Sequence, residues 1–177
     1  MKIFLNPGHD RRLDSGAVHP TRGLRECDLA YALGERVKHY LEARRMTVLT
    51  EQQHNLQAVC AHANESGAHI FVSLHFNAFN GRAGGTETLV GRSAAAVLLG
   101  HAVQARVQQV LQLPDRGIKE RPDLYVLRAT RMPAILVETC FIDNDADLRR
   151  YEGREDACAH AVADGICQYG DAAGFRV

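Results

Sequence analysis

Four polar side chains in this sequence, His9, Glu26, His75 and Glu138, are of the types that catalytic zinc sites use. Two imidazoles and one carboxylate, with a fourth position left to water, form a common ligand set for catalytic zinc. The open position allows the metal to acidify a water molecule and to polarise a carbonyl. A second carboxylate that does not bind the metal can take the water's proton and pass it to a leaving amine.

The places of these residues along the chain support a shared site. His9 comes after the first predicted strand, His75 comes directly after the third, and Glu138 ends the last. In an open α/β sheet, ligands bind beyond the carboxyl ends of the strands. We therefore expect these three residues to gather at one edge of the sheet, with Glu26 joining them from the first turn of a helix.

Each of the four also has a structural explanation when it is taken singly. His9 could be an ordinary surface histidine in a turn, and Glu26 could only complement the dipole of its helix. His75 and Glu138 are harder to explain in this way, because each stands where an apolar run ends and a charged side chain there is rarely unpaired. Because the carboxyl ends of the strands lie at one edge of the sheet, a shared site explains the four residues better than four separate structural roles do.

The elements that must position these residues alternate along the chain. Apolar, often β-branched runs predict strands at 2–5, 46–50, 69–74, 86–90, 124–128 and 134–138. Helical spacing of apolar residues predicts helices at 26–45 and at about 55–66, 93–112 and 145–168. The segments 79–85 and 114–123 are interpreted as surface loops. Alternation of this kind predicts an α/β fold, a three-layer α/β/α sandwich with a mixed, mostly parallel sheet of about six strands.

Composition narrows the class of protein further. The chain has 177 residues, which suits one domain spanning 1–177, and its 21 basic and 21 acidic residues give a formal net charge of zero. This balance argues against nucleic acid or a membrane surface as the main partner. The five cysteines are odd in number and lack C-x-x-C spacing, so neither a disulfide framework nor a cysteine zinc site is indicated. The N-terminus has no signal-peptide pattern, so we expect synthesis in the cytoplasm.

Seven blocks of the sequence occur in one order. They are LNPGHD, LRECDLAYALGERVKHYLEARRMTVLT, HANESGAHIFVSLHFNA, GGTETLV, DRGIK, LYVLRATRMPAILVETCFIDN and the last predicted helix. Together they resemble the zinc-dependent N-acetylmuramoyl-L-alanine amidases of the amidase-3 family. The resemblance covers nearly the whole chain, from Ile3 to about Tyr169.

The resemblance implies a role for each candidate residue. His9, Glu26 and His75 match the family's metal ligands, which implies one zinc ion per chain. Glu138 matches its catalytic glutamate. The implied reaction is hydrolysis, by a zinc-activated water, of the amide between the lactyl group of N-acetylmuramic acid and the L-alanine of the stem peptide.

Two further residues, Asn77 and Arg128, are candidates for substrate binding, Asn77 through its place in the family's His-x-Asn motif. The implied partner is peptidoglycan. We expect the enzyme to act on the cell wall after its release from the cell, either as a phage lysis enzyme or as an autolysin freed when a mother cell lyses. The oligomeric state is left open.

Two other readings of the sequence remain open. One is a thiol hydrolase that uses Cys140 with His75, although nothing near Cys140 in the sequence lowers the pKa of its thiol. The other is a non-catalytic module that binds the cell wall, although binding alone does not require Glu138.

Overall fold

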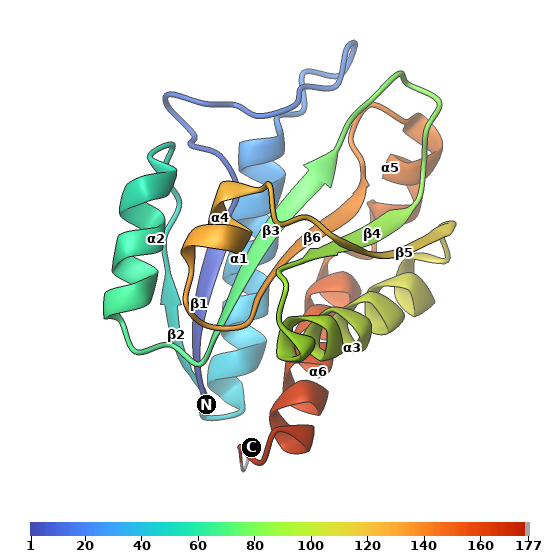
Figure 1. The fold of residues 1–177 in the computed structure, drawn as a ribbon. Helices are drawn as coiled ribbons and strands as arrows, with labels where there is room; N and C mark the ends of the chain where they lie inside the picture. Colours follow the sequence, from blue (N-terminus) through green and yellow to red (C-terminus); the bar gives the residue numbers. More distant parts are fainter. Residues whose placement is uncertain (176–177) are drawn as a thin grey trace.

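Six strands form one sheet through the middle of the protein, and the computed structural model describes residues 1–175 (Figure 1). The strands are β1 (Lys2–Pro7), β2 (Thr47–Thr50), β3 (Ile70–Asn77), β4 (Thr86–Val90), β5 (Asp115–Glu120) and β6 (Ala134–Phe141). The helices are α1 (Glu26–Ala43), α2 (Leu56–Glu65), α3 (Ala94–Leu111), α4 (Tyr125–Ala129), α5 (Asp145–Tyr151) and α6 (Glu155–Ala172). The order of the strands is β2-β1-β3-β6-β4-β5.

Helices cover both faces of this sheet, which confirms the predicted three-layer α/β/α sandwich (Figure 1). On one face, α1, α3 and α6 pack on alternate strand residues such as Leu5, Val72 and Val137. On the other face, α2 and α4 pack on the intervening residues, including Phe71 and Leu136. Each central strand is therefore buried on both sides, as its near-continuous apolar run requires.

The directions of the strands decide which residues meet at the upper edge of the sheet in Figure 1. Strands β2, β1, β3 and β6 are parallel, whereas β4 runs antiparallel to β6 and β5 runs parallel to β4. The carboxyl ends of β1, β3 and β6 consequently share one edge with the first residues of β4 and β5. The prediction of a mixed, mostly parallel sheet is confirmed.

Two sequence predictions were wrong in the same region. Residues 124–128 were predicted as a strand, but 125–129 form the short helix α4; residues 114–123 were predicted as a loop, but 115–120 form β5. A short apolar run does not separate strand from helix by periodicity, and in α4 the neighbouring Val126 and Leu127 are both buried. Strand β5 lies at the edge of the sheet and pairs only with β4, so it tolerates charged residues.

The predicted helix at 145–168 is also wrong in its boundaries. The structure divides it into α5 and α6, and Gly153 between them has φ of +80°. A glycine adopts this left-handed conformation without the steric cost that a side chain brings.

A β-bulge between β3 and β6 determines which face of the sheet the last side chains of β6 lie on. His75 pairs with Glu138, but Asn77 pairs with Phe141, so β6 contains one residue more than β3 between these pairs. Because strand side chains alternate between faces, the extra residue reverses the alternation after Glu138. Cys140 therefore packs in the core with α6, away from the face on which Glu138 lies.

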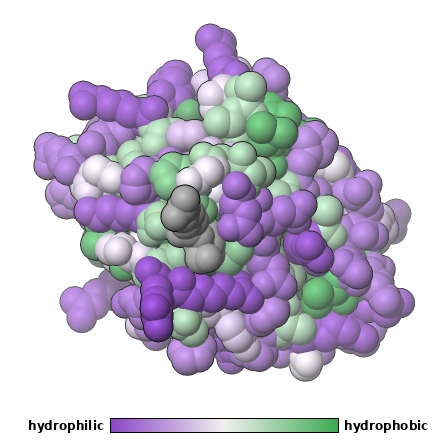
Figure 2. Space-filling view, turned by 90° about the horizontal axis from the view of Figure 1, so that it is seen from below, coloured by the Kyte–Doolittle hydropathy of each residue, from purple (hydrophilic) through white to green (hydrophobic). Residues whose placement is uncertain are grey.

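The outer surface differs from these interior layers. Seen from below, at the end that carries the chain termini, the molecule presents mostly hydrophilic residues with smaller hydrophobic groups between them (Figure 2). No helix within residues 1–175 combines the length and the apolar character that a membrane span needs.

The contact between α3 and α6 gives a prediction for stability. A Cβ atom at Gly165 would lie 2.6 Å from the Cα of Val103 and 2.8 Å from the carbonyl oxygen of Ala102. These are backbone atoms, so relief requires the two helices to move apart. We expect Gly165→Val to lower the free energy of unfolding by about 1–3 kcal/mol in urea denaturation. Ala157→Val, at an exposed position of the same helix, is the control, and equal stability of both variants would contradict this packing.

Candidate metal centre

Three of the candidate residues meet at the upper edge of the sheet. The ligand atoms of His9, Glu26 and His75 all lie within 4.8 Å of one another. Glu26 lies between the two histidines: its Oε2 is 2.9 Å from His9 Nε2, and its Oε1 is 2.9 Å from His75 Nδ1. The loop after β1, the first turn of α1 and the end of β3 supply one residue each.

The carboxylate of Glu26 is held by backbone as well as by the histidines. Its Oε1 accepts a hydrogen bond from the Phe76 N–H (3.0 Å) and its Oε2 accepts one from the Ala17 N–H (2.9 Å). Glu26 is only 4% exposed. Burial by itself raises the pKa of this carboxyl, but hydrogen bonds from His75 and His9 outweigh it and hold the pKa well below its usual range. The group is therefore an ionised carboxylate in a fixed orientation.

His9 is oriented by a second carboxylate. Its Nδ1 lies 2.9 Å from Asp14 Oδ2, which leaves Nε2 directed at Glu26. Burial lowers the pKa of His9, but the bonds to Glu26 and Asp14 outweigh it and raise the pKa to about 9. A carboxylate on the far nitrogen of a metal-binding histidine fixes its tautomer and increases its basicity. Asp14 is thus a supporting residue that the sequence analysis did not identify.

The absence of side chains at Gly8 and Gly16 makes space for the candidate metal ligands. A Cβ atom at Gly8 would lie 2.4 Å from the His75 ring, and one at Gly16 would lie 2.5 Å from the His9 ring and 2.6 Å from Glu26 Oε2. Any other residue at either position would displace a candidate ligand. The turn that begins at Gly8 also holds His9 at φ of +65°, a conformation uncommon for residues other than glycine.

The arrangement fits a zinc ion. Four tetrahedral donors at about 2.0–2.1 Å from zinc stand roughly 3.3 Å apart. Each histidine nitrogen lies 2.9 Å from a different oxygen of Glu26, and the three ligand atoms lie within 4.8 Å of one another, so side-chain movements would bring them to this spacing. Two imidazole nitrogens and a carboxylate oxygen are a donor set that zinc prefers, and three protein donors leave one position for water.

Glu138 lies beside this cluster without belonging to it. It pairs in register with His75 across β3 and β6, but its carboxylate is not among the three residues whose ligand atoms converge. Its Oε2 is buried and has no hydrogen-bond partner among residues 1–175. Burial raises the pKa of Glu138 to about 7; the charge of His75 opposes this rise, and those of Glu26 and Glu87 add to it. A buried carboxylate with a free oxygen is suited to accepting and releasing a proton.

A cavity of about 210 Å³ opens onto the cluster. Among its lining residues are His9 and His75, with Tyr125 and Val126 from α4 and Leu136 from β6. Helix α4, which was predicted as a strand, therefore forms an apolar wall of the candidate site.

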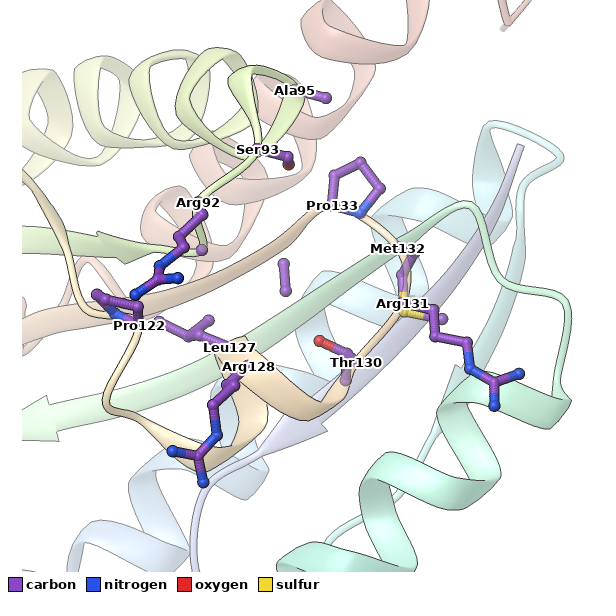
Figure 3. Close-up of a pocket in the computed structure, with 12 residues that line it drawn as sticks. Arg92, Ser93, Ala95, Pro122, Leu127, Arg128, Thr130, Arg131, Met132 and Pro133 are labelled. Atoms are coloured by element: carbon purple, nitrogen blue, oxygen red, sulfur yellow. The ribbon is translucent and has the colours of Figure 1, made fainter.

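The two predicted substrate residues lie in different places. Asn77, at the end of β3, donates from Nδ2 to Glu87 Oε1 at 2.9 Å. Arg128, on α4, lines another cavity of about 450 Å³ together with Arg92 and Arg131 (Figure 3). Arg128 does not line the cavity at the metal cluster. The substrate roles of Asn77 and Arg128 remain predictions.

Glu87 is a further buried carboxylate that the sequence analysis did not single out. It lies on β4 in register with Glu138 and is 6% exposed. The alternation of side chains in TETLV places Glu87 on the same face of the strand as the buried Leu89. This alternation could have predicted that Glu87 is buried.

The sequence of this chain is similar to those of known proteins. The chain is 33% identical to the uncharacterized protein YqiI of Bacillus subtilis (strain 168), over 96% of this chain and 84% of YqiI. It is 32% identical to the N-acetylmuramoyl-L-alanine amidase LytC of the same strain, over 94% of this chain but 35% of LytC. The chain therefore spans most of one relative and about a third of the other.

A solved structure shows the same fold. The crystal structure of N-acetylmuramoyl-L-alanine amidase from Clostridium difficile 630 matches with a TM-score of 0.89 and 28% identity, over 96% of each chain. The family described as N-acetylmuramoyl-L-alanine amidase, amidase-3, matches residues 3–168. Since that match takes in the whole sheet except Lys2 and all but the last residues of α6, this chain belongs to the amidase-3 family.

Proposed function

We propose that this protein is a zinc-dependent peptidoglycan hydrolase that cleaves the amide between the lactyl group of N-acetylmuramic acid and the L-alanine of the stem peptide. The observation that carries the proposal is the convergence of His9, Glu26 and His75 next to Glu138, whose Oε2 has no partner among residues 1–175. Family membership supports the choice of substrate.

The residues that would hold zinc are His9 through Nε2, His75 through Nδ1, and Glu26 through its carboxylate. When bound, zinc supplies Lewis acidity, which polarises the scissile carbonyl and lowers the pKa of a water molecule. Asp14 keeps the proton of His9 on Nδ1, so that Nε2 presents its lone pair. Gly8 and Gly16 keep the three side chains from being displaced.

Glu138 is proposed to move the proton. Its Oε2 accepts a proton from the attacking water as the new C–O bond forms at the lactyl carbonyl. The same carboxyl then gives that proton to the alanine nitrogen as the C–N bond breaks, so that an amine leaves rather than an amide anion. Glu138 ends the cycle ionised, as it began.

This reaction fits better than the two other readings of the sequence. Cys140 is buried in the core on the α6 side, and burial raises the pKa of its thiol well above the usual value. A thiol there is neither ionised nor in reach of substrate. A binding module would have no use for a buried carboxylate whose oxygen lacks a partner, because such a group costs stability. Action on the wall after release from the cytoplasm remains part of the proposal.

The first test of this function is Glu138→Gln. We expect the wild type to release stem peptides with free L-alanine amino termini from purified peptidoglycan, measured by mass spectrometry. Because Glu138 moves a proton but does not hold the metal, the variant should keep wild-type zinc content and lose roughly 10²–10⁴ in turnover. Glu35→Gln, on the exposed side of α1, is the control. Full activity of Glu138→Gln, or loss of its zinc, would refute the assigned role.

The second test concerns Cys140. We expect Cys140→Ala to keep turnover within about threefold of the wild type, because the thiol lies in the core, and to lower the free energy of unfolding by about 1 kcal/mol, roughly the contribution of one buried methylene-sized group. Paired turnover and urea-denaturation measurements check both expectations. A folded Cys140→Ala protein without activity would instead revive the thiol mechanism.

A further inference from the structure

A charged cluster stands beside the candidate metal centre, and the proposed mechanism makes no use of it. Glu87 of β4 accepts hydrogen bonds on Oε2 from Arg116 Nε at 3.0 Å and from Lys119 Nζ, and on Oε1 from Asn77 at 2.9 Å. We call Glu87, Arg116 and Lys119 the β4–β5 charge cluster. Two cations oppose one carboxylate, so the cluster carries one excess positive charge.

The strand register places this cluster on the same face as the metal ligands. His75 on β3 pairs with Glu138 on β6, and Glu138 pairs with Glu87 on β4. Neighbouring strands are about 4.8 Å apart, so Glu87 lies roughly 10 Å from His75, with Glu138 between them. A substrate seated at the metal centre therefore meets the cluster when it extends past Glu138.

The cations are placed for contact with a ligand rather than only for neutralising Glu87. Glu87 is 6% exposed, whereas the side chains of Arg116 and Lys119 are 35% and 44% exposed. Arg116 is also held against the ring of Phe141, 5.1 Å from its centroid. A buried carboxylate that fixes two partly exposed cations resembles the support that oriented binding groups need.

The chemistry of the substrate indicates what such a site would take. In a muramoyl-peptide, the lactyl carboxyl is used in the scissile amide, so the free carboxylates lie in the peptide beyond L-alanine. An extended peptide advances about 3.3–3.6 Å per residue, so roughly 10 Å corresponds to the second or third residue. We propose, on the basis of the proposed function, that Arg116 and Lys119 bind a free carboxylate of the stem peptide on the leaving-group side.

The test compares two stem peptides beginning with L-alanine, identical except that the carboxylates beyond alanine are either free or converted to carboxamides. Binding is measured by calorimetry, and kcat/KM is measured on the matching pair of muramoyl-peptides. We expect the wild type to prefer the free carboxylates by about tenfold or more, the usual scale for a hydrogen bond to a charged group. Lys119→Gln should reduce the preference several-fold through KM, because it removes one of the two cations that meet the carboxylate.

Lys38→Gln is the matched control, because Lys38 is also partly exposed and paired with a glutamate, but on α1. Equal binding of both peptides by the wild type, or a loss in Lys119→Gln that is the same for both peptides, would overturn the subsite. Carboxylate-selective binding without turnover of either muramoyl-peptide would retain the subsite and refute the proposed function. Turnover of both muramoyl-peptides without selectivity for the free carboxylates would retain the proposed function and refute the subsite.

Discussion

The site depends on one buried carboxylate placed between two imidazoles. Glu26 contacts both His9 and His75 at 2.9 Å, and two backbone N–H groups complete its hydrogen bonding. Burying an ionised carboxylate is costly unless its partners are close and well oriented. The fold meets this requirement by bringing the first turn of α1 against the ends of β1 and β3. Both candidate histidines are thereby held by a carboxylate that is itself hydrogen-bonded to the backbone of β3.

The topology of the sheet then decides what stands next to that carboxylate. Parallel pairing of β3 with β6 puts Glu138 beside His75, and antiparallel pairing of β6 with β4 adds Glu87. Three acidic groups in one region would repel one another. Histidines compensate Glu26, two cations compensate Glu87, and Glu138 alone has an oxygen without a partner. Glu26 and Glu87 are therefore fixed by oppositely charged partners, whereas Glu138 keeps an oxygen that is available to exchange a proton.

Sequence patterns were sufficient for the parts that follow from periodicity and from the strand-end rule. His9, His75 and Glu138 could be placed at one edge because each follows an apolar run. Glu87, Arg116 and Lys119 could not, since their meeting depends on β5, a charged edge strand without the apolar alternation that reveals a strand. Asp14, Gly8 and Gly16 were missed for another reason: their roles depend on close approach between loops, which spacing along the chain does not encode.

We propose that Glu26, His9 and His75 form a zinc site with no sulfur ligand. X-ray absorption at the zinc edge of the zinc-loaded protein tests it most directly. A site of two imidazoles and one carboxylate should give a shell of nitrogen and oxygen neighbours at about 2.0–2.1 Å, with the outer-shell scattering of imidazole rings. A sulfur neighbour at about 2.3 Å, or a shell without imidazole scattering, would contradict it.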